Sequence, residues 1–344
     1  MQNDRTVLRD AEIRLRNIHR HQWHLLRNRM LRKGRLFPKL ALPQTMDEKF
    51  LWRKLLDHDP RFVIMSDKLA TKRWLAARWP ELPVASVLWT SRTGRDLPYD
   101  LCAPGVVLKY NCGSHTNLVL GSDVPARKHL VGRLRSWLRT DYGWETGEWG
   151  YSPVRRRVFA EANAFPGRPV SEIKAYMQGG FLDRLVMIYQ DGPKKTAAIW
   201  QDHGQGLELT QATAAVSPIR DTRPLPEVAA RACRIARMIG AEFDHVRVDF
   251  MTDLQDLVVG EMTIYNLGGR VSDLGHLRDV RMNRHWDLRR SWFLNSYHTG
   301  WKQRYAAALR AQLDRQAEND PVMAEVAALP CSVFDICYDD YAPD

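Results

Sequence analysis

The clearest pattern of hydrophobic and polar positions in this chain lies in two neighbouring stretches, residues 247–251 and 257–263. Each stretch predicts a short strand, and the polar residues between them predict a turn. Because successive side chains of a strand point to opposite faces, Arg247 and Asp249 share one face of the first strand. Glu261 lies on the polar face of the second strand. Pairing of the strands as a hairpin would bring a cation and two carboxylates together on one surface, with an apolar core behind it.

Two carboxylates on neighbouring strands suit a hard cation such as Mg²⁺. This ion takes one or two protein carboxylates and completes its octahedron with water and phosphate oxygens. An adjacent arginine suits a phosphate or carboxylate substrate, because its planar fork donates two parallel hydrogen bonds. The alternative interpretation is an edge hairpin whose charged side chains face water. The residues of the hairpin alone do not decide between the two.

Two amphipathic helices are predicted in the first quarter of the chain. The first begins after Thr45, its N-cap, with Glu48 as the partner in a capping box. The second begins after Ser66, its candidate N-cap, and carries Lys68 in its first turn. A cation at that position opposes the helix dipole unless an anion is bound at the helix start. The alternative is an exposed lysine paired with Asp67.

A strand, a small polar loop and a returning strand follow. The apolar run at residues 106–110 predicts a strand that carries Lys109, and residues 111–117 predict the loop. Backbone N–H groups around Gly113 and Ser114 can bind phosphate oxygens, and the lysine would supply a charge beside them. The loop is not a P-loop, which requires GxxxxGK[ST] before a helix. Alone, it is weak evidence for a phosphate site.

Further strands and one long polar segment are predicted between this loop and the hairpin. One strand contains Glu161, and another carries Glu172 and Lys174 on one face. The polar residues 191–224 are expected to form a loop over the site. Residues 276–344 are expected to be helical with a polar end, and they suggest no chemistry.

The composition is that of a globular protein. The 344 residues are 44% hydrophobic and 26% charged, with 12 tryptophans, which is enough for two or three packed subdomains. The net charge of +11 favours acidic partners, such as nucleotides, nucleic acid, acidic glycans or anionic lipid, without choosing among them. There is no apolar run of about 18 residues, so no membrane span is predicted.

The N-terminal residues 1–36 are strongly basic and helix-like. They lack the apolar core of a signal peptide, so a cytoplasmic protein is expected. We interpret the segment as a helix packed on its own domain, and the alternative is peripheral contact with a membrane surface. Its histidines, His19, His21 and His24, are expected at the surface. The five cysteines are scattered, without a CxxC pair, which indicates reduced thiols.

In chain order, these segments resemble the ATP-grasp superfamily and, within it, the TupA-like branch. The segments that carry the resemblance are TMDEKFLWRKLLDHDP, SDK, VVLKYNCGSHTN, EWGY before RRVFAEANA, EIKAYMQGG, VRVDFM and GEMTIYNLGG. They extend over roughly residues 38–275. The resemblance implies an α+β fold, the ATP-grasp fold, in which two α+β subdomains enclose ATP between helical N- and C-terminal extensions.

The resemblance also implies the domain organisation and the cofactors. The expected parts are an N-terminal helical segment at 1–60, a small lobe with the phosphate loop at 61–158, a large lobe with the metal and substrate residues at 159–275, and a C-terminal helical extension at 276–344. ATP and Mg²⁺ are the implied cofactors.

Motif positions that match the family carry implied roles in nucleotide binding. Lys68 and Lys109 would contact the ATP phosphates, and the loop at Gly113 and Ser114 would close over them. Glu161 would lie at the adenine end of the nucleotide. The roles of these five residues follow from the resemblance and not from the residue pattern alone.

The resemblance assigns further roles on the metal and substrate side. Glu172 would lie near the ribose, and Lys174 occupies the place of the lysine in a DYK motif of this branch. Asp249 and Glu261 would bind Mg²⁺. Arg247 would hold the acyl substrate or its phosphorylated intermediate, so this arginine and Lys174 are the implied catalytic residues.

Some positions depart from the family pattern. Many ATP-grasp ligases have an asparagine as a further metal ligand where this chain has Thr263, so Asn266 or water would take that place. The acidic residue of the DYK motif is Glu172, and Cys112 replaces a histidine in the loop. This cysteine is interpreted as a small residue at the base of the loop and not as a nucleophile.

The implied activity is that of an ATP-dependent carboxylate–amine ligase that releases ADP and forms a C–N bond. Its implied partners are ATP, an acidic carboxylate substrate such as a uronic-acid glycan, and an amine or amino acid, in the synthesis of bacterial cell-surface polysaccharide. The first alternative is an ATP-dependent phosphotransferase that acts on a glycan or small molecule. The second is a basic nucleic-acid-binding protein, although the basic residues are dispersed and no nucleic-acid-binding signature occurs.

Overall fold

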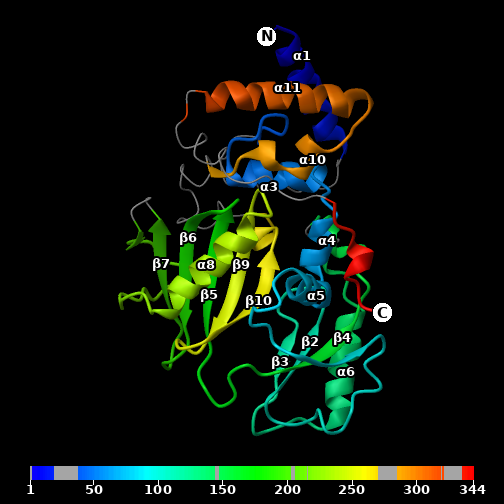
Figure 1. Ribbon diagram of the computed structural model, residues 1–344. Coiled ribbons are helices and arrows are strands. Elements are labelled where there is room, and N and C mark those ends of the chain that lie inside the picture. Colours follow the sequence, from blue (N-terminus) through cyan, green and yellow to red (C-terminus); the bar gives the residue numbers. More distant parts are fainter. Residues whose placement is uncertain are drawn as a thin grey trace.

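The computed structural model describes residues 2–18, 38–143, 147–202, 206–214, 216–269, 285–318, 320 and 335–344. These residues form a small lobe (β1–β4 and α6), a large lobe (β5–β10 and α8) and a helical cap (α1, α3, α10 and α11), which lies at the top of Figure 1. Helices α4 and α5 lie between the two lobes. The fold is α+β, as predicted, because both sheets are antiparallel and the helices are not alternating crossovers.

The small lobe is a four-stranded sheet covered by one helix. Its strands are β1 (Val87–Ser91), β2 (Val106–Tyr110), β3 (Asn117–Val119) and β4 (Val158–Ala162), in the order β1-β4-β2-β3. Helix α6 (Arg127–Leu138) packs against β2 and β4 through buried Leu130 and Leu134. Since β4 pairs with β1 and β2, the boundary between the two sheets lies after Ala162, and not between residues 158 and 159 as predicted.

The large lobe is a six-stranded sheet in the order β10-β9-β5-β6-β7-β8. The strands are β5 (Ser171–Gln178), β6 (Phe181–Tyr189), β7 (Thr196–Asp202), β8 (Leu207–Leu209), β9 (Val246–Thr252) and β10 (Leu257–Thr263). Helix α8 (Val228–Gly240) packs its apolar side against β5, β6 and β9. The predicted hairpin is confirmed as β9 and β10, and it forms one edge of the sheet.

The segment at residues 191–224 was predicted to form a loop over the site, and this prediction is wrong. It supplies β7 and β8, which extend the sheet on the side away from β9 and β10. The apolar residues Ala197, Ala198 and Ile199 are buried on β7. Their short apolar run is enclosed by polar residues in the sequence, which hides the strand pattern.

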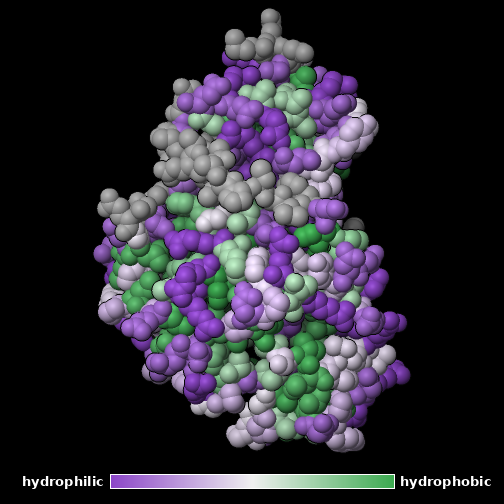
Figure 2. Space-filling view, viewed as in Figure 1, coloured by the Kyte–Doolittle hydropathy of each residue, from purple (hydrophilic) through white to green (hydrophobic). Residues whose placement is uncertain are grey.

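The helical cap joins segments from the two ends of the sequence, α1 and α11. Helix α1 (Gln2–Ile18) packs against α11 (Gly300–Ala317), with Arg315 and Asp4 in an ion pair of 3.3 Å. Helix α3 (Met46–Leu55) has the predicted capping box, and the short α10 (Trp292–Asn295) follows the turn η5 (Leu288–Arg290). In Figure 2, hydrophilic side chains cover most of the visible cap, and hydrophobic side chains gather on the small lobe.

Helix α1 therefore packs on its own domain, which is the interpretation favoured from the sequence. The three N-terminal histidines, His19, His21 and His24, lie outside the described residues. Among the described helices, none is both long and apolar enough to cross a bilayer.

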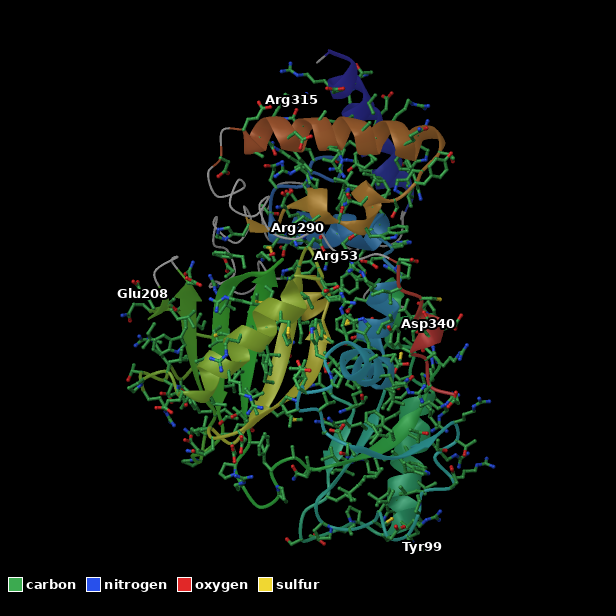
Figure 3. The ribbon with its side chains drawn as sticks, viewed as in Figure 1. Arg53, Tyr99, Glu208, Arg290, Arg315 and Asp340 are labelled. Carbon is green, nitrogen blue, oxygen red and sulfur yellow. The ribbon has the colours of Figure 1, made fainter. Side chains whose placement is uncertain are left out.

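Arg53 of α3 connects the cap to the hairpin (Figure 3). Its fully buried guanidinium donates to the carbonyl oxygens of His245 (3.2 Å) and Ile264 (3.0 Å), and to Asp244 (2.5 Å). These residues lie just before β9 and just after β10. The arginine therefore fixes both open ends of the hairpin at once. The ring of Trp286 packs over the Arg53 guanidinium, with 4.5 Å between the guanidinium carbon and the ring centre.

Helices α4 (Arg61–Ser66) and α5 (Lys68–Arg78) are separated by one residue, Asp67. Asp67 is the N-cap of α5, because its carboxylate accepts from the N–H groups of Leu69 (2.9 Å) and Ala70 (3.3 Å). The predicted N-cap, Ser66, instead ends α4 and donates its hydroxyl to Phe62 O. Lys68 is the first residue of α5, in the first turn as predicted.

Candidate functional site

A row of charged side chains crosses three strands of the large lobe. Lys174 on β5 is the register partner of Asp249 on β9, and Asp249 is the register partner of Glu261 on β10. Directly opposite residues of an antiparallel pair project from the same face. The predicted convergence of Arg247, Asp249 and Glu261 on one surface is confirmed, and Lys174 extends the row to a third strand.

The register of this row depends on a bulge in β10. Val259 pairs with Phe250 and Glu261 pairs with Asp249, so Gly260 is an extra residue opposite the same stretch of β9. Such an insertion shifts the following side chains to the other face of the sheet. A Cβ atom at position 260 would lie 3.3 Å from the carbonyl oxygen of Asp249, so the close approach favours glycine.

The carboxylate of Asp249 is bonded to two cations. Arg247 donates from Nε to Oδ1 and from Nη2 to Oδ2, both at 2.6 Å, and Lys174 Nζ lies 3.2 Å from Oδ2. Burial raises the pKa of Asp249, but the charges of Arg247 and Lys174 and their hydrogen bonds outweigh it, so this pKa lies below its ordinary value. Asp249 is therefore ionised at neutral pH.

Lys174 lies between two carboxylates on the same face. Its Nζ donates to Glu172 Oε2 at 2.6 Å as well as to Asp249. Burial lowers the pKa of Lys174, but Asp249 and Glu172 raise it by more, so the pKa lies above its ordinary value. Lys174 is an ammonium at neutral pH and does not serve as a general base. Gln190 Nε2 donates to the second oxygen of Glu172 at 3.4 Å.

Glu261 differs from Asp249 in its bonding. Its carboxylate accepts no hydrogen bond within the described part of the chain, and its side chain is 34% exposed. The nearest cation is Lys68 of α5, whose Nζ lies 3.5 Å from Oε2. This contact spans from the helix between the lobes to the large-lobe sheet, so Glu261 faces the lysine-bearing side of the site.

The carboxylates fit a hard divalent cation in part. Glu261 has free oxygens and Asp249 Oδ1 accepts one hydrogen bond only, whereas the described ranges contain no group of three or more His, Cys, Asp or Glu residues that could hold a metal. Mg²⁺ requires one or two carboxylates, with water and phosphate oxygens in its other positions. The residues present therefore fit Mg²⁺ when a phosphate ligand completes its shell.

Asn266, the predicted third ligand, is held elsewhere. Its side chain is fully buried beyond the end of β10, and Nδ2 donates to Nε2 of His245 at 2.9 Å. The other ring nitrogen of His245 donates to Met177 O and Gln178 Oε1, at 2.9 and 3.0 Å. His245 is itself buried, and burial lowers its pKa well below the ordinary value. The network therefore holds the side-chain amide of Asn266 in the core. In the structure, Asn266 therefore contacts His245 in the core and does not belong to the charged row.

Lys68 lies beside the predicted phosphate loop. Its backbone N–H donates to Asn111 O at 3.0 Å, and its Nζ donates to Gly113 O at 2.5 Å. Asn111 Nδ2 also donates to the capping carboxylate of Asp67 at 2.8 Å, which ties the start of α5 to the end of β2. The alternative of an exposed Lys68 paired with Asp67 is therefore wrong. Ser114 follows in the same loop and is partly exposed.

Cys112, at the base of this loop, is buried, and its Sγ donates to Tyr151 O at 3.5 Å. Burial raises the pKa of its thiol to about 11. A nucleophilic cysteine requires a lowered pKa, so this residue packs the loop and does not act as a nucleophile.

Lys109 and Glu161 contact each other across β2 and β4. Lys109 Nζ is ion-paired with Oε1 of Glu161, and Lys72 Nζ of α5 lies 3.1 Å from Oε2. Glu161 was predicted to lie at the adenine end of the nucleotide. In the structure, an ammonium group lies next to each of its two carboxylate oxygens. Lys72 was missed in the sequence, although it lies four residues after Lys68 and therefore on the same face of a helix.

A contact from the far end of the chain was also missed. Tyr338, in the turn η6 (Tyr338–Asp340), donates its hydroxyl to Oδ2 of Asp67 at 2.8 Å and accepts from Arg155 N at 2.9 Å. It completes the bonding of the α5 cap. No sequence pattern links positions 271 residues apart, so the sequence does not reveal this contact.

No protein family model matches this chain, and no curated protein is similar to it at a significant level. Among solved structures, it is similar to D-alanine–D-alanine ligase from Bacillus anthracis, with 17% identity and a TM-score of 0.37 over 68% of this chain and 71% of that chain. A complex of that ligase with ATP matches with 16% identity and a TM-score of 0.35, over 58% of this chain and 55% of that chain. Biotin carboxylase from Campylobacter jejuni matches with 15% identity and a TM-score of 0.34, over 70% of this chain and 48% of that chain. The chain thus spans about half the length of the ATP-bound ligase structure and of the biotin carboxylase.

Proposed function

We propose that this protein is an ATP-grasp enzyme, an ATP-dependent ligase that activates a carboxylate as an acyl phosphate and joins it to an amine. One observation carries the proposal. The charged row Lys174–Asp249–Glu261 on the large lobe faces Lys68, which lies beside the loop and strand that carry Gly113 and Lys109. The site therefore has a carboxylate side for a metal ion and an ammonium side for phosphates.

The nucleotide would lie between these two sides. Lys68 and Lys109 would contact the phosphates as point charges, and the loop at Gly113 and Ser114 would move over them. In the present arrangement Lys68 donates to the carbonyl oxygen of Gly113, so phosphate binding would exchange this contact for a stronger charged one. Glu172, which lies next to Lys174 on the row, would accept from the ribose hydroxyls.

Glu261 and Asp249 would hold Mg²⁺, with Glu261 supplying the open carboxylate. When bound, the ion would neutralise charge on the phosphate oxygens and orient them. Lys174 keeps Asp249 ionised and in place, which is consistent with its raised pKa.

Arg247 would hold the carboxylate substrate. Its Nε and Nη2 are bonded to Asp249 and Thr263, whereas Nη1 makes no hydrogen bond within the described residues. Two N–H groups are thus available for an anionic substrate. A substrate carboxylate oxygen would attack the γ-phosphorus and release ADP, and an amine would then attack the acyl carbon and release phosphate. Positioned charges supply most of the catalysis in such transfers, and exclusion of water protects the acyl phosphate.

The substrates are proposed from the sequence resemblance and the charge of the chain. The TupA-like branch points to an acidic glycan, such as a uronic-acid polymer of the bacterial cell surface, and to an amino acid as the amine. The net charge of +11 is compatible with an acidic substrate. We place the reaction in the cytoplasm, where ATP and polymer precursors are available.

A phosphotransferase is the second candidate, and one observation favours it. Lys174 is held as an ammonium between Glu172 and Asp249, so it does not accept a proton from an attacking amine. A carboxylate of a glycan or small molecule can be phosphorylated without such an acceptor, so the same site could stop at phosphoryl transfer to either substrate.

Release of ADP, followed by product analysis, tests the proposal. Purified protein would be incubated with Mg²⁺, ATP and a panel of uronic acids and amino acids, and products would be identified by mass spectrometry. An amide together with ADP and phosphate supports the ligase, and a phosphorylated product with ADP and no amide supports the phosphotransferase. Absence of both ATP binding and ATP turnover would exclude the two candidates together.

A further inference from the structure

Glu161 is a buried carboxylate that holds two lysines from different elements. Its side chain is 1% exposed on β4. Lys109 reaches Oε1 from β2, and Lys72 reaches Oε2 from α5 at 3.1 Å. The glutamate therefore places two ammonium groups next to each other at the junction of the small lobe and α5.

This group carries an excess positive charge. Two ammoniums share one carboxylate, and the side chains of Lys72 and Lys109 are only 11% and 13% exposed. Burial lowers the pKa of Lys72, Glu161 raises it, and Lys109 lowers it, with a net decrease. Keeping two like charges in a sheltered position has a free-energy cost, which an anion bound between them would offset.

The two ammoniums also keep unused donors. Lys72 Nζ donates to Ala85 O at 2.9 Å and is ion-paired with Oε2 of Glu161 at 3.1 Å, which occupies two of its three donor positions. Within the described part of the chain, Lys109 Nζ makes no hydrogen bond or ion pair other than the one with Glu161. One donor of Lys72 and two of Lys109 thus remain for a ligand. Lys72 lies on the same face of α5 as Lys68, four residues away, so both lysines of this helix lie on the side of the proposed nucleotide site.

We propose that Lys72 is a third phosphate-binding lysine of the nucleotide site and that Glu161 is the positioning residue that sets Lys72 and Lys109 side by side. The proposal rests on the proposed function, because it takes the ligand to be the polyphosphate chain of a nucleotide. It assigns a ligand contact to Lys72, which the sequence motifs do not include. It also gives Glu161 a role toward the lysines in place of one toward adenine.

A purely structural role for Lys72 makes a different prediction. In that case the lysine only ties α5 to the segment before β1 through Ala85 O, and its removal changes stability without changing the preference for phosphate. A phosphate contact, by contrast, weakens the binding of ATP and leaves the binding of adenosine unchanged. The ratio of the two affinities separates the roles.

Isothermal titration of the full chain with ATP and with adenosine measures this ratio. Lys72→Met is expected to raise the Kd for ATP by about tenfold or more, as for loss of a charged hydrogen bond, with adenosine affinity within about twofold of wild type. Lys72→Arg retains the charge and is expected to restore most of the ATP affinity. Lys128→Met is the matched control, because Lys128 is exposed on α6 and makes no ion pair within the described ranges. Its ATP affinity is expected to equal that of wild type.

A Lys72→Met protein that unfolds at the wild-type temperature and binds ATP within about twofold of wild type would overturn the proposal. Wild-type protein that binds no nucleotide would instead overturn the proposed function, and this inference with it. The two failures are therefore distinguishable in one data set.

Glu161→Gln tests the positioning role even where Lys72→Met does not fold. The charged groups that face Lys72 in the described structure are Glu161 of β4 and Lys109 of β2. Glu161 raises the pKa of Lys72, so its neutralisation lowers that pKa further. The ATP affinity of Glu161→Gln is then expected to decline at a lower pH than that of wild type in titrations between pH 6 and pH 10. Superimposable pH profiles would show that Glu161 does not set the lysines and would contradict the proposal.

Discussion

Asp249 and Glu261 are register partners on β9 and β10, yet only Asp249 has both oxygens bonded to cations. Glu261 accepts no hydrogen bond within the described residues and faces Lys68 at 3.5 Å. One carboxylate is thus fixed by the protein, and its neighbour is available to a ligand. This difference separates their expected contributions to stability and to function.

Neutralisation of the two carboxylates should therefore have different consequences. Asp249→Asn leaves the mostly buried Arg247 without its ionic partner and should reduce the free energy of unfolding by about 3 kcal/mol. Glu261→Gln removes only a partly exposed pair with Lys68 and should cost less than about 1 kcal/mol. Both variants should lose ADP release. Urea unfolding with an ADP assay measures the two effects, and equal stability of both variants would argue against the difference in bonding.

Arg53 should contribute more to stability than any exposed arginine. Its guanidinium is fully buried, and it bonds Asp244 and two carbonyl groups at the open ends of the hairpin. Arg53→Met should lower the free energy of unfolding by about 3–5 kcal/mol, because Asp244 loses its buried partner. Arg78→Met is the control, since Arg78 makes a partly exposed ion pair with Glu242 and should cost less than about 1 kcal/mol. Comparable losses in the two variants, measured by urea unfolding, would contradict this account of the hairpin.

Lys49 should make stability rise with pH in the alkaline range. Burial lowers its pKa to about 8, although Asp287, Asp244 and Glu48 raise it. Below about pH 8 the folded and unfolded chains are both protonated at Lys49, and the cost of the buried ammonium is complete. Between about pH 8 and pH 10.5 the folded chain releases the proton first, so this cost is progressively relieved.

The comparison with Lys49→Met isolates this effect, because methionine does not titrate. The free energy of unfolding of wild type, minus that of Lys49→Met, should increase from pH 7 to pH 10 in chemical denaturation. A difference that stays constant, or that decreases, would show that Lys49 is not deprotonated in the folded protein.

Cys112 should be chemically inert and dispensable for turnover. Its thiol is buried, and burial raises its pKa to about 11. Alkylation with iodoacetamide at pH 8, followed by peptide mass mapping, should label the exposed Cys337 and leave Cys112 unmodified. Cys112→Ala should retain ADP release within about twofold and lose about 1 kcal/mol of stability from the small cavity. Rapid labelling of Cys112, or complete loss of turnover in the alanine variant, would restore the nucleophile hypothesis.

The local elements of the site were predictable from the sequence. The alternation of polar and apolar residues predicted the strand that carries Arg247 and Asp249, and Thr45 and Glu48 predicted the capping box of α3. A single glycine within a strand pattern is a sign of a bulge, so the shift at Gly260 could also have been anticipated. These features depend on residues close together in the sequence, where periodicity and turn chemistry carry the information.

The contacts that the sequence did not reveal lie between distant segments. Lys174 joins Asp249 only because β5 pairs with β9, and periodicity does not specify which strands pair. Tyr338 reaches Asp67 from the other end of the chain, and Asn266 is drawn into the core by His245. In each case a polar group obtains its partner through tertiary packing, which a pattern along the chain does not contain.

The central claim is that the carboxylate of Glu261 presents a divalent ion to a triphosphate held by lysines. It is tested most directly by measuring ATP binding with and without Mg²⁺ to wild type and to Glu261→Gln. Isothermal titration should show that Mg²⁺ strengthens ATP binding to wild type by about tenfold or more. In Glu261→Gln this strengthening should be lost, while the Mg²⁺-free affinity stays within about twofold of wild type. A Glu261→Gln protein that binds ATP with the full Mg²⁺ dependence of wild type would contradict the account.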